Sequence, residues 1–109
     1  MDVLKEEAAL RSAEGSYDRA AELWQQAIDR EPGRPSNHLG LAAALAGAGR
    51  IDTAIAHYEK ALALGADPVF YRRLAELYGK VGRIDDAVRA GAMYEKALQG
   101  DRTSQERAR

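Results

Sequence analysis

The sequence contains no cysteine, only three prolines, one tryptophan and no long hydrophobic run. Without thiols the chain can form neither a disulfide framework nor a sulfur-ligated metal site, and it has no cysteine nucleophile. The longest nearly uncharged stretch, residues 39–49, is too short and too rich in glycine to cross a bilayer core of about 30 Å. The formal net charge is −1, which gives no general attraction to nucleic acid or anionic membranes. We therefore expect no nucleic-acid partner and no membrane association.

The first residues also differ from those of an exported protein. A secretory signal needs a basic start followed by an apolar stretch. Residues 1–7, MDVLKEE, instead alternate charged and apolar side chains in helical fashion. We therefore predict a cytoplasmic location.

Residues able to support catalysis are few. His38 and His57 are the only histidines, and no third ligand or nucleophile pattern accompanies them. A zinc site uses three or four ligands at suitable spacing. The glycines around Lys80 lack the spacing of a phosphate-binding loop. The sequence thus predicts no catalytic residue, no metal site and no cofactor.

What the sequence does contain is an internal repeat. The segment at residues 49–55, GRIDTAI, returns at residues 82–88 as GRIDDAV, and a more degenerate copy, GSYDRAA, stands at residues 15–21. A period of about 34 residues is typical of helical arrays, in which each unit buries its apolar face against its neighbours. The whole chain is therefore interpreted as one repeat architecture.

Apolar residues at spacings of three and four predict three pairs of helices. Pro35 and Pro68 suit the first turn of a helix and would open the second and third pairs. Gly15, Gly49 and Gly82 favour the positive φ of a tight turn inside each pair. The predicted helices cover about residues 2–14, 17–30, 35–48, 51–64, 69–81 and 84–99.

Two further glycines fall inside a predicted helix rather than at a turn. Gly40 and Gly47 share one helical face with Ala43. A glycine weakens a helix by about 1 kcal/mol relative to alanine, so each position needs a compensating reason. Either a neighbouring helix approaches this face closely, which is the more common reason, or the face forms a hollow for a bulky side chain of a partner.

The small, aromatic and glycine positions resemble those of the tetratricopeptide repeat, a helix-turn-helix unit of about 34 residues. The resemblance is clearest in the second unit, through Leu41, Gly49, Ala54, Tyr58 and Ala61. It implies an all-α fold in which antiparallel helix-turn-helix repeats stack into a right-handed α-solenoid. The expected repeats are residues 1–34, 35–67 and 68–100, the third with a lengthened last helix, followed by a polar, disordered tail at residues 101–109.

The resemblance also implies a function, because such arrays bind a peptide or helix of a partner in a concave groove made by the first helix of each pair. Transferred to this sequence, the groove positions are Lys5, Ala9, Ser36, Leu39, Gly40, Ala43, Gly47, Val69, Arg72, Arg73, Glu76 and Lys80. The basic residues among the last five favour a protein or peptide partner in which acidic residues flank an apolar anchor. An ordinary solvated helix face is the alternative interpretation of these charges.

The last predicted helix supports a second hypothesis. Val88, Tyr94 and Leu98 leave its outer face partly apolar, although no further repeat follows to cover it. These side chains either fold inward or form a surface for self-association. The sequence therefore predicts a non-catalytic interaction module or scaffold, with a homodimer through the last helix as the alternative.

Overall fold

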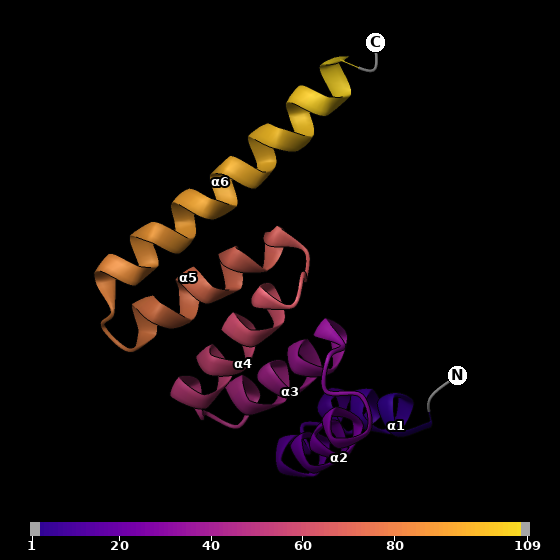
Figure 1. The fold of residues 1–109 in the computed structure, drawn as a ribbon. Coiled ribbons are helices and arrows are strands. Elements are labelled where there is room, and N and C mark those ends of the chain that lie inside the picture. Colours follow the sequence, from indigo (N-terminus) through magenta and orange to yellow (C-terminus); the bar gives the residue numbers. More distant parts are fainter. Residues whose placement is uncertain (1–2, 108–109) are drawn as a thin grey trace. The chain divides into compact units, whose positions relative to one another are not determined.

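This computed structural model describes residues 3–107, with side chains described up to residue 100, and most of these residues are helical. Six α-helices, one short 3-10 helix (η1) and no strand occur within that range (Figure 1). Their bounds are α1 Val3–Ala13, α2 Tyr17–Arg30, α3 Pro35–Gly47, α4 Ile51–Ala63, η1 Pro68–Phe70, α5 Tyr71–Lys80 and α6 Ile84–Arg107. The predicted all-α arrangement of paired helices is confirmed.

The repeated glycines make the turns inside the pairs. Gly15, Gly49 and Gly82 have φ values of 81°, 84° and 78°, a region in which side chains with a Cβ are strained. The amide of the residue after each glycine donates a hydrogen bond back to the last turn of the helix, from Ser16 to Arg11, from Arg50 to Leu45 and from Arg83 to Tyr78. This pattern is that of a Schellman motif, and it lets each helix end in a short reversal.

Residues 1–66 form one compact unit. Within it α1 packs on α2, α2 on α3 and α3 on α4. Ala20, Ala42 and Ala54 have no exposed surface, as expected for small residues where two helices cross closely. Larger side chains fill the remaining interior, among them Ile55 and Tyr58.

A buried amide joins α2 to α3 in this unit. The Asn37 side chain is fully buried, and its Nδ2 donates hydrogen bonds to the carbonyls of Ala27 (3.3 Å) and Glu31 (3.1 Å). Its Oδ1 has no hydrogen-bond partner among the described residues. Asn37 therefore links the C-terminal end of α2 to the start of α3.

Residues 67–109 form the second compact unit. In it α5 packs on α6, and η1 contacts both helices. The Asp67 carboxylate accepts a hydrogen bond from the Val69 amide at 2.9 Å and so caps η1. The predicted helix at residues 69–81 therefore begins as a 3-10 turn, and α5 proper starts at Tyr71.

The last helix is longer than predicted. α6 continues through Gly100 to Arg107 instead of ending near residue 99, so residues 101–107 are helical in the structure. A single glycine weakens a helix by only about 1 kcal/mol, and no proline follows it to interrupt the backbone hydrogen bonds. Residues 108 and 109 of the predicted disordered tail lie outside the described residues.

Candidate functional site

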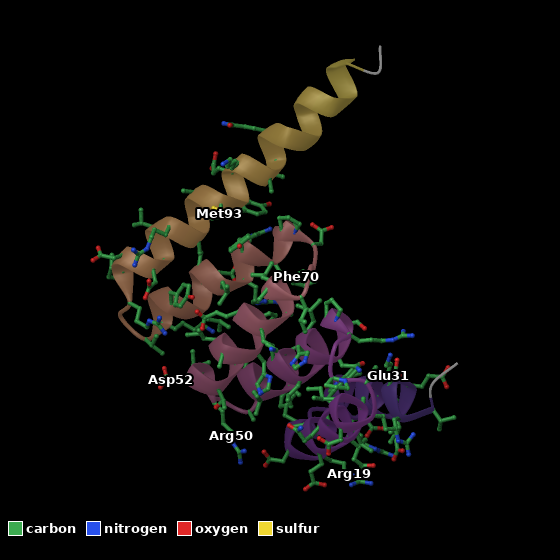
Figure 2. All side chains as sticks on the ribbon, viewed as in Figure 1. Arg19, Glu31, Arg50, Asp52, Phe70 and Met93 are labelled. Atoms are coloured by element: carbon green, nitrogen blue, oxygen red, sulfur yellow. The ribbon has the colours of Figure 1, made fainter. Side chains whose placement is uncertain are left out.

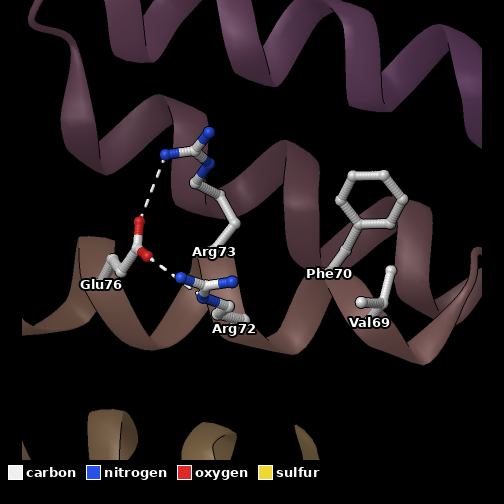
Figure 3. Close-up of a pocket in the computed structure, with 5 residues that line it drawn as sticks. All are labelled: Val69, Phe70, Arg72, Arg73 and Glu76. Atoms are coloured by element: carbon white, nitrogen blue, oxygen red, sulfur yellow. Dashed lines mark hydrogen bonds and ion pairs between the residues drawn. The ribbon is translucent and has the colours of Figure 1, made fainter.

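A pocket of about 410 Å³ lies at the start of α5 in the second unit. It is lined by Val69, Phe70, Arg72, Arg73 and Glu76, which Figure 3 shows as an apolar pair at one end and the charged side chains at the other. Four of these five residues belong to the predicted partner contacts. Phe70 is the addition, and the apolar residue following Val69 in η1 is the sequence signal that could have identified it.

The charges of this pocket are partly paired. Arg73 Nη1 donates a hydrogen bond to Glu76 Oε2 at 3.2 Å, and Arg72 Nε lies 3.7 Å from Glu76 Oε1. All three side chains are exposed to solvent. Two guanidinium groups against one carboxylate leave the pocket positive, next to the exposed Val69 side chain. The arrangement suits a ligand that carries both an anionic and an apolar group.

The other predicted contacts lie elsewhere. Lys80 is the last residue of α5 and does not line this pocket. The remaining ones belong to the first unit, where α1 and α3 are in contact. Of these, Ala9, Ser36, Ala43 and Gly47 are exposed, whereas Lys5, Leu39 and Gly40 are half-buried.

The structure explains the two glycines inside α3 by close packing. The indole of Trp24 lies on Gly40, and the phenol ring of Tyr17 lies on Gly47. A Cβ added to either glycine would come closer than 3.0 Å to ring atoms, which side chains do not tolerate without moving. Of the two explanations for these glycines, a hollow for a partner's side chain is therefore wrong, because rings of α2 occupy that space.

A second pocket, of about 510 Å³, lies within the first unit and has no counterpart in the sequence prediction. It is lined by Asp18, Ala21, Glu22 and Gln25 of α2, Leu41 and Leu45 of α3, and Arg50, Thr53 and His57 beside or on α4. The ion pair between Arg50 Nη2 and Asp18 Oδ1, at 3.6 Å, joins its two sides. Arg50 stands at the start of α4 (Figure 2). The helical spacing of Asp18, Glu22 and Gln25 is the signal that could have indicated a polar wall.

The two histidines, interpreted from the sequence as isolated, form a pair. Their Nδ1 atoms are 3.4 Å apart, and His38 Nε2 donates a hydrogen bond to the Pro32 carbonyl at 2.9 Å. The two rings are stacked, with their planes 22° apart and their centroids separated by 5.7 Å. Burial lowers the pKa of His57, and the charge of His38 lowers this pKa further.

The geometry restricts the protons of this pair. The Pro32 carbonyl can only accept, so His38 Nε2 carries a hydrogen. One of the two Nδ1 atoms must then donate and the other accept. A doubly charged pair would place two N–H groups against each other. No group of three or more His, Cys, Asp or Glu side chains that could hold a metal ion occurs in the described part of the chain.

The predicted self-association residues lie on α6. Val88 is 67% exposed and Leu98 is 45% exposed, whereas Tyr94 is half-buried. Ile84 and Met93 are further exposed apolar residues of this helix, and Met93 is labelled in Figure 2. Across residues 3–107, no helix combines the length and the apolar character needed to span a membrane.

The family model of the tetratricopeptide repeat matches residues 12–67 of this sequence. No curated protein matches it. Among solved structures, the type III secretion translocator chaperone SycD of Yersinia enterocolitica, in an alternative dimer form, is similar with a TM-score of 0.83 and 22% identity. That match covers 96% of this chain and 80% of SycD.

Two solved MamA chains have a similar fold. MamA from AMB-1 has a TM-score of 0.77 and 24% identity, covering 85% of this chain and 51% of MamA. MamA from residue 41 to its end, from Desulfovibrio magneticus RS-1, has a TM-score of 0.76 and 18% identity, covering 92% of this chain and 55% of that one. This chain thus spans about half of either MamA chain. At these identities the likeness establishes the helical-repeat fold.

Proposed function

We propose that this chain, which belongs to the tetratricopeptide repeat family, is a non-catalytic interaction module that binds an acidic peptide segment of another protein. One observation carries the proposal: exposed Arg72 and Arg73 share a pocket with Val69 and Phe70. Guanidinium groups bind carboxylates through paired hydrogen bonds, and an adjacent apolar surface receives an aliphatic or aromatic anchor. The proposed ligand is therefore a peptide in which glutamate or aspartate flanks a leucine or phenylalanine.

Family membership supports this class of function. Helical arrays present extended surfaces to peptides, and SycD, which shares the fold, is a chaperone. The predicted contacts of the first unit stay predictions and do not line this pocket: Lys5, Ala9, Ser36, Leu39, Gly40, Ala43 and Gly47. Gly40 and Gly47 would contribute to binding indirectly. Because they have no side chain, the rings of Trp24 and Tyr17 can pack closely on α3 and hold it against α2.

The test is the affinity of a fluorescently labelled peptide with leucine between glutamates. Replacing Arg72 and Arg73 together by glutamate is expected to weaken binding by about tenfold or more, since two charged contacts become repulsive. The stability of the folded chain should change by no more than about 0.5 kcal/mol, because both side chains are exposed.

A matched control variant is available in the first unit. Arg19 and Arg34 are exposed and pair with an acidic residue one turn away, Glu22 and Glu31 respectively. The Arg19→Glu/Arg34→Glu variant changes the net charge by the same amount at a distance along the chain from the pocket. Equal loss of affinity in both variants would show that the net charge of the chain, and not this pocket, determines binding. Absence of binding by the wild type would contradict the proposal.

Self-association through α6 is the second candidate function. It is favoured by the exposure of Val88 and Leu98, and SycD was solved in a dimer form. Light scattering over a range of concentrations tests it. A dimer that is abolished by Val88→Glu or Tyr94→Glu would support this function, and a monomer at every concentration would exclude it.

A further inference from the structure

Glu76 occupies the position at which a ligand carboxylate would meet the two arginines of the pocket. Its Oε2 accepts a hydrogen bond from Arg73 Nη1 at 3.2 Å, and its Oε1 lies 3.7 Å from Arg72 Nε. Figure 3 shows one carboxylate facing both guanidinium groups. The side chain thus imitates the anionic group of the proposed ligand.

The fit of Glu76 is incomplete. Its contact with Arg73 is a hydrogen bond, whereas 3.7 Å to Arg72 is too long for one. All three residues lie within two turns of α5, so the helix itself limits how the carboxylate can approach the guanidinium planes. A carboxylate on a separate peptide has no such tether, and it can form two parallel hydrogen bonds with a guanidinium group.

Solvent weakens the internal pairs. The side chains of Arg72, Arg73 and Glu76 are 69%, 58% and 47% exposed. Ion pairs this exposed contribute little to stability, so a ligand can replace Glu76 at small cost. The remaining carboxylate would still repel an anionic ligand nearby.

We infer that Glu76 is a built-in competitor for the partner's carboxylate, and that it sets the affinity of the site rather than contacting the partner favourably. This inference rests on the proposed function and reassigns one residue of the predicted binding set. The ligand group is an anion that accepts hydrogen bonds from both arginines. A peptide carboxylate is the source that we favour, because a carboxylate already occupies this position, and a phosphorylated side chain offers similar chemistry.

The experiment measures the affinity of the leucine peptide flanked by glutamates for the wild type and for Glu76→Gln. Glutamine keeps the size of the side chain and removes its charge, so affinity should rise by about two- to threefold, the size expected for loss of exposed charge pairs. Glu95→Gln is the matched control: it removes an exposed carboxylate of the same unit that does not line the pocket. This control should leave the affinity unchanged.

The outcomes separate the inference from the proposed function. Unchanged or weaker binding by Glu76→Gln, together with loss of binding by Arg72→Glu/Arg73→Glu, would overturn the inference and keep the function. An equal gain of affinity in Glu95→Gln would also overturn the inference, because it would show that the net charge alone raises the affinity. A peptide with glutamines in place of glutamates should show no gain in Glu76→Gln, and a gain there would also contradict competition.

A phosphoserine peptide distinguishes the two sources of the anion. Tighter binding of the glutamate peptide than of the phosphoserine peptide by the wild type supports a carboxylate ligand. The reverse order would overturn that assignment. Absence of binding by every protein to every peptide would contradict the inference and the proposed function together.

Discussion

Glycine has opposite roles in the helices of the two units. In α3 of the first unit, Gly40 and Gly47 lie directly under aromatic rings of α2. In the second unit, Gly79 of α5 and Gly91 of α6 have no atom within 4 Å of the place where a Cβ would stand. The same residue therefore indicates close helix packing in one unit and uncovered helix surface in the other.

Both units bury some of their larger side chains and expose others. The first unit buries Trp24 at least in part and Tyr58 almost completely, and it holds a buried amide and a paired histidine. The second unit buries Leu74, Leu77 and Tyr78 and exposes Val69 and Val88, while the first unit also exposes Val3 and Leu10 of α1. A surface that its own chain leaves uncovered is available to a partner, which is why both proposed interaction surfaces include residues of the second unit.

The largest expected effect tests the packing of Trp24 on Gly40. Gly40→Ala should lower the free energy of unfolding by about 1–2 kcal/mol, because overpacking outweighs the helix propensity gained. In a Trp24→Ala background the same change should stabilise the chain by about 1 kcal/mol, since the ring is gone. Urea denaturation followed by circular dichroism gives both values as a double-mutant cycle. Equal effects in the two backgrounds would show that the ring does not limit this position.

A smaller effect of opposite sign is expected in the second unit. Gly91→Ala should raise the free energy of unfolding by about 0.5–1 kcal/mol, because the helix gains propensity and the new methyl group meets no neighbour. Gly82→Ala is the matched control, since the same change at φ 78° should cost about 1–2 kcal/mol. Thermal and urea denaturation measure both. Destabilisation by Gly91→Ala would mean that α6 is covered there in solution.

Much of this fold could be predicted from the sequence, because the repeat encodes local structure. The turns at Gly15, Gly49 and Gly82 follow from a glycine at the same place in each copy. The helices also begin and end close to the predicted residues. The exceptions are the ends of the pattern: Asp67 converts the start of the α5 segment to a 3-10 turn, and α6 continues where apolar periodicity stops.

The contacts between helices could not be predicted in the same way. Which ring covers Gly40 depends on how α2 crosses α3, and periodicity along one helix contains no information on that crossing. The pairing of His38 with His57 and the second pocket have the same origin, since their residues come from different helices. Within α5 the case is different, because Arg72, Arg73 and Glu76 are neighbours on one helix. Their clustering was therefore predictable.

The smallest expected effect is on the pH dependence of stability. It is expected in the first unit, because both histidines belong to that unit. The pKa of His57 is lowered in the folded chain, chiefly by burial and then by His38. Between the ordinary value of about 6.5 and the lowered value, the unfolded chain binds the proton more readily. Stability is therefore full above this window and falls as the pH decreases through it.

The measurement is urea denaturation at a series of pH values, followed by the fluorescence of Trp24, the single tryptophan and a residue of the first unit. Asp18, Glu22 and Arg50 line the same pocket as His57 and are unchanged in the variant described next. His57→Gln cannot titrate and should flatten the profile. One contrary result is a wild type whose free energy of unfolding shows no pH dependence in this range, and another is the same dependence in His57→Gln. Either result would show that protonation of His57 does not disturb its contact with His38. Loss of the slope in the variant would instead assign the acid sensitivity of the first unit to the contact between α3 and α4.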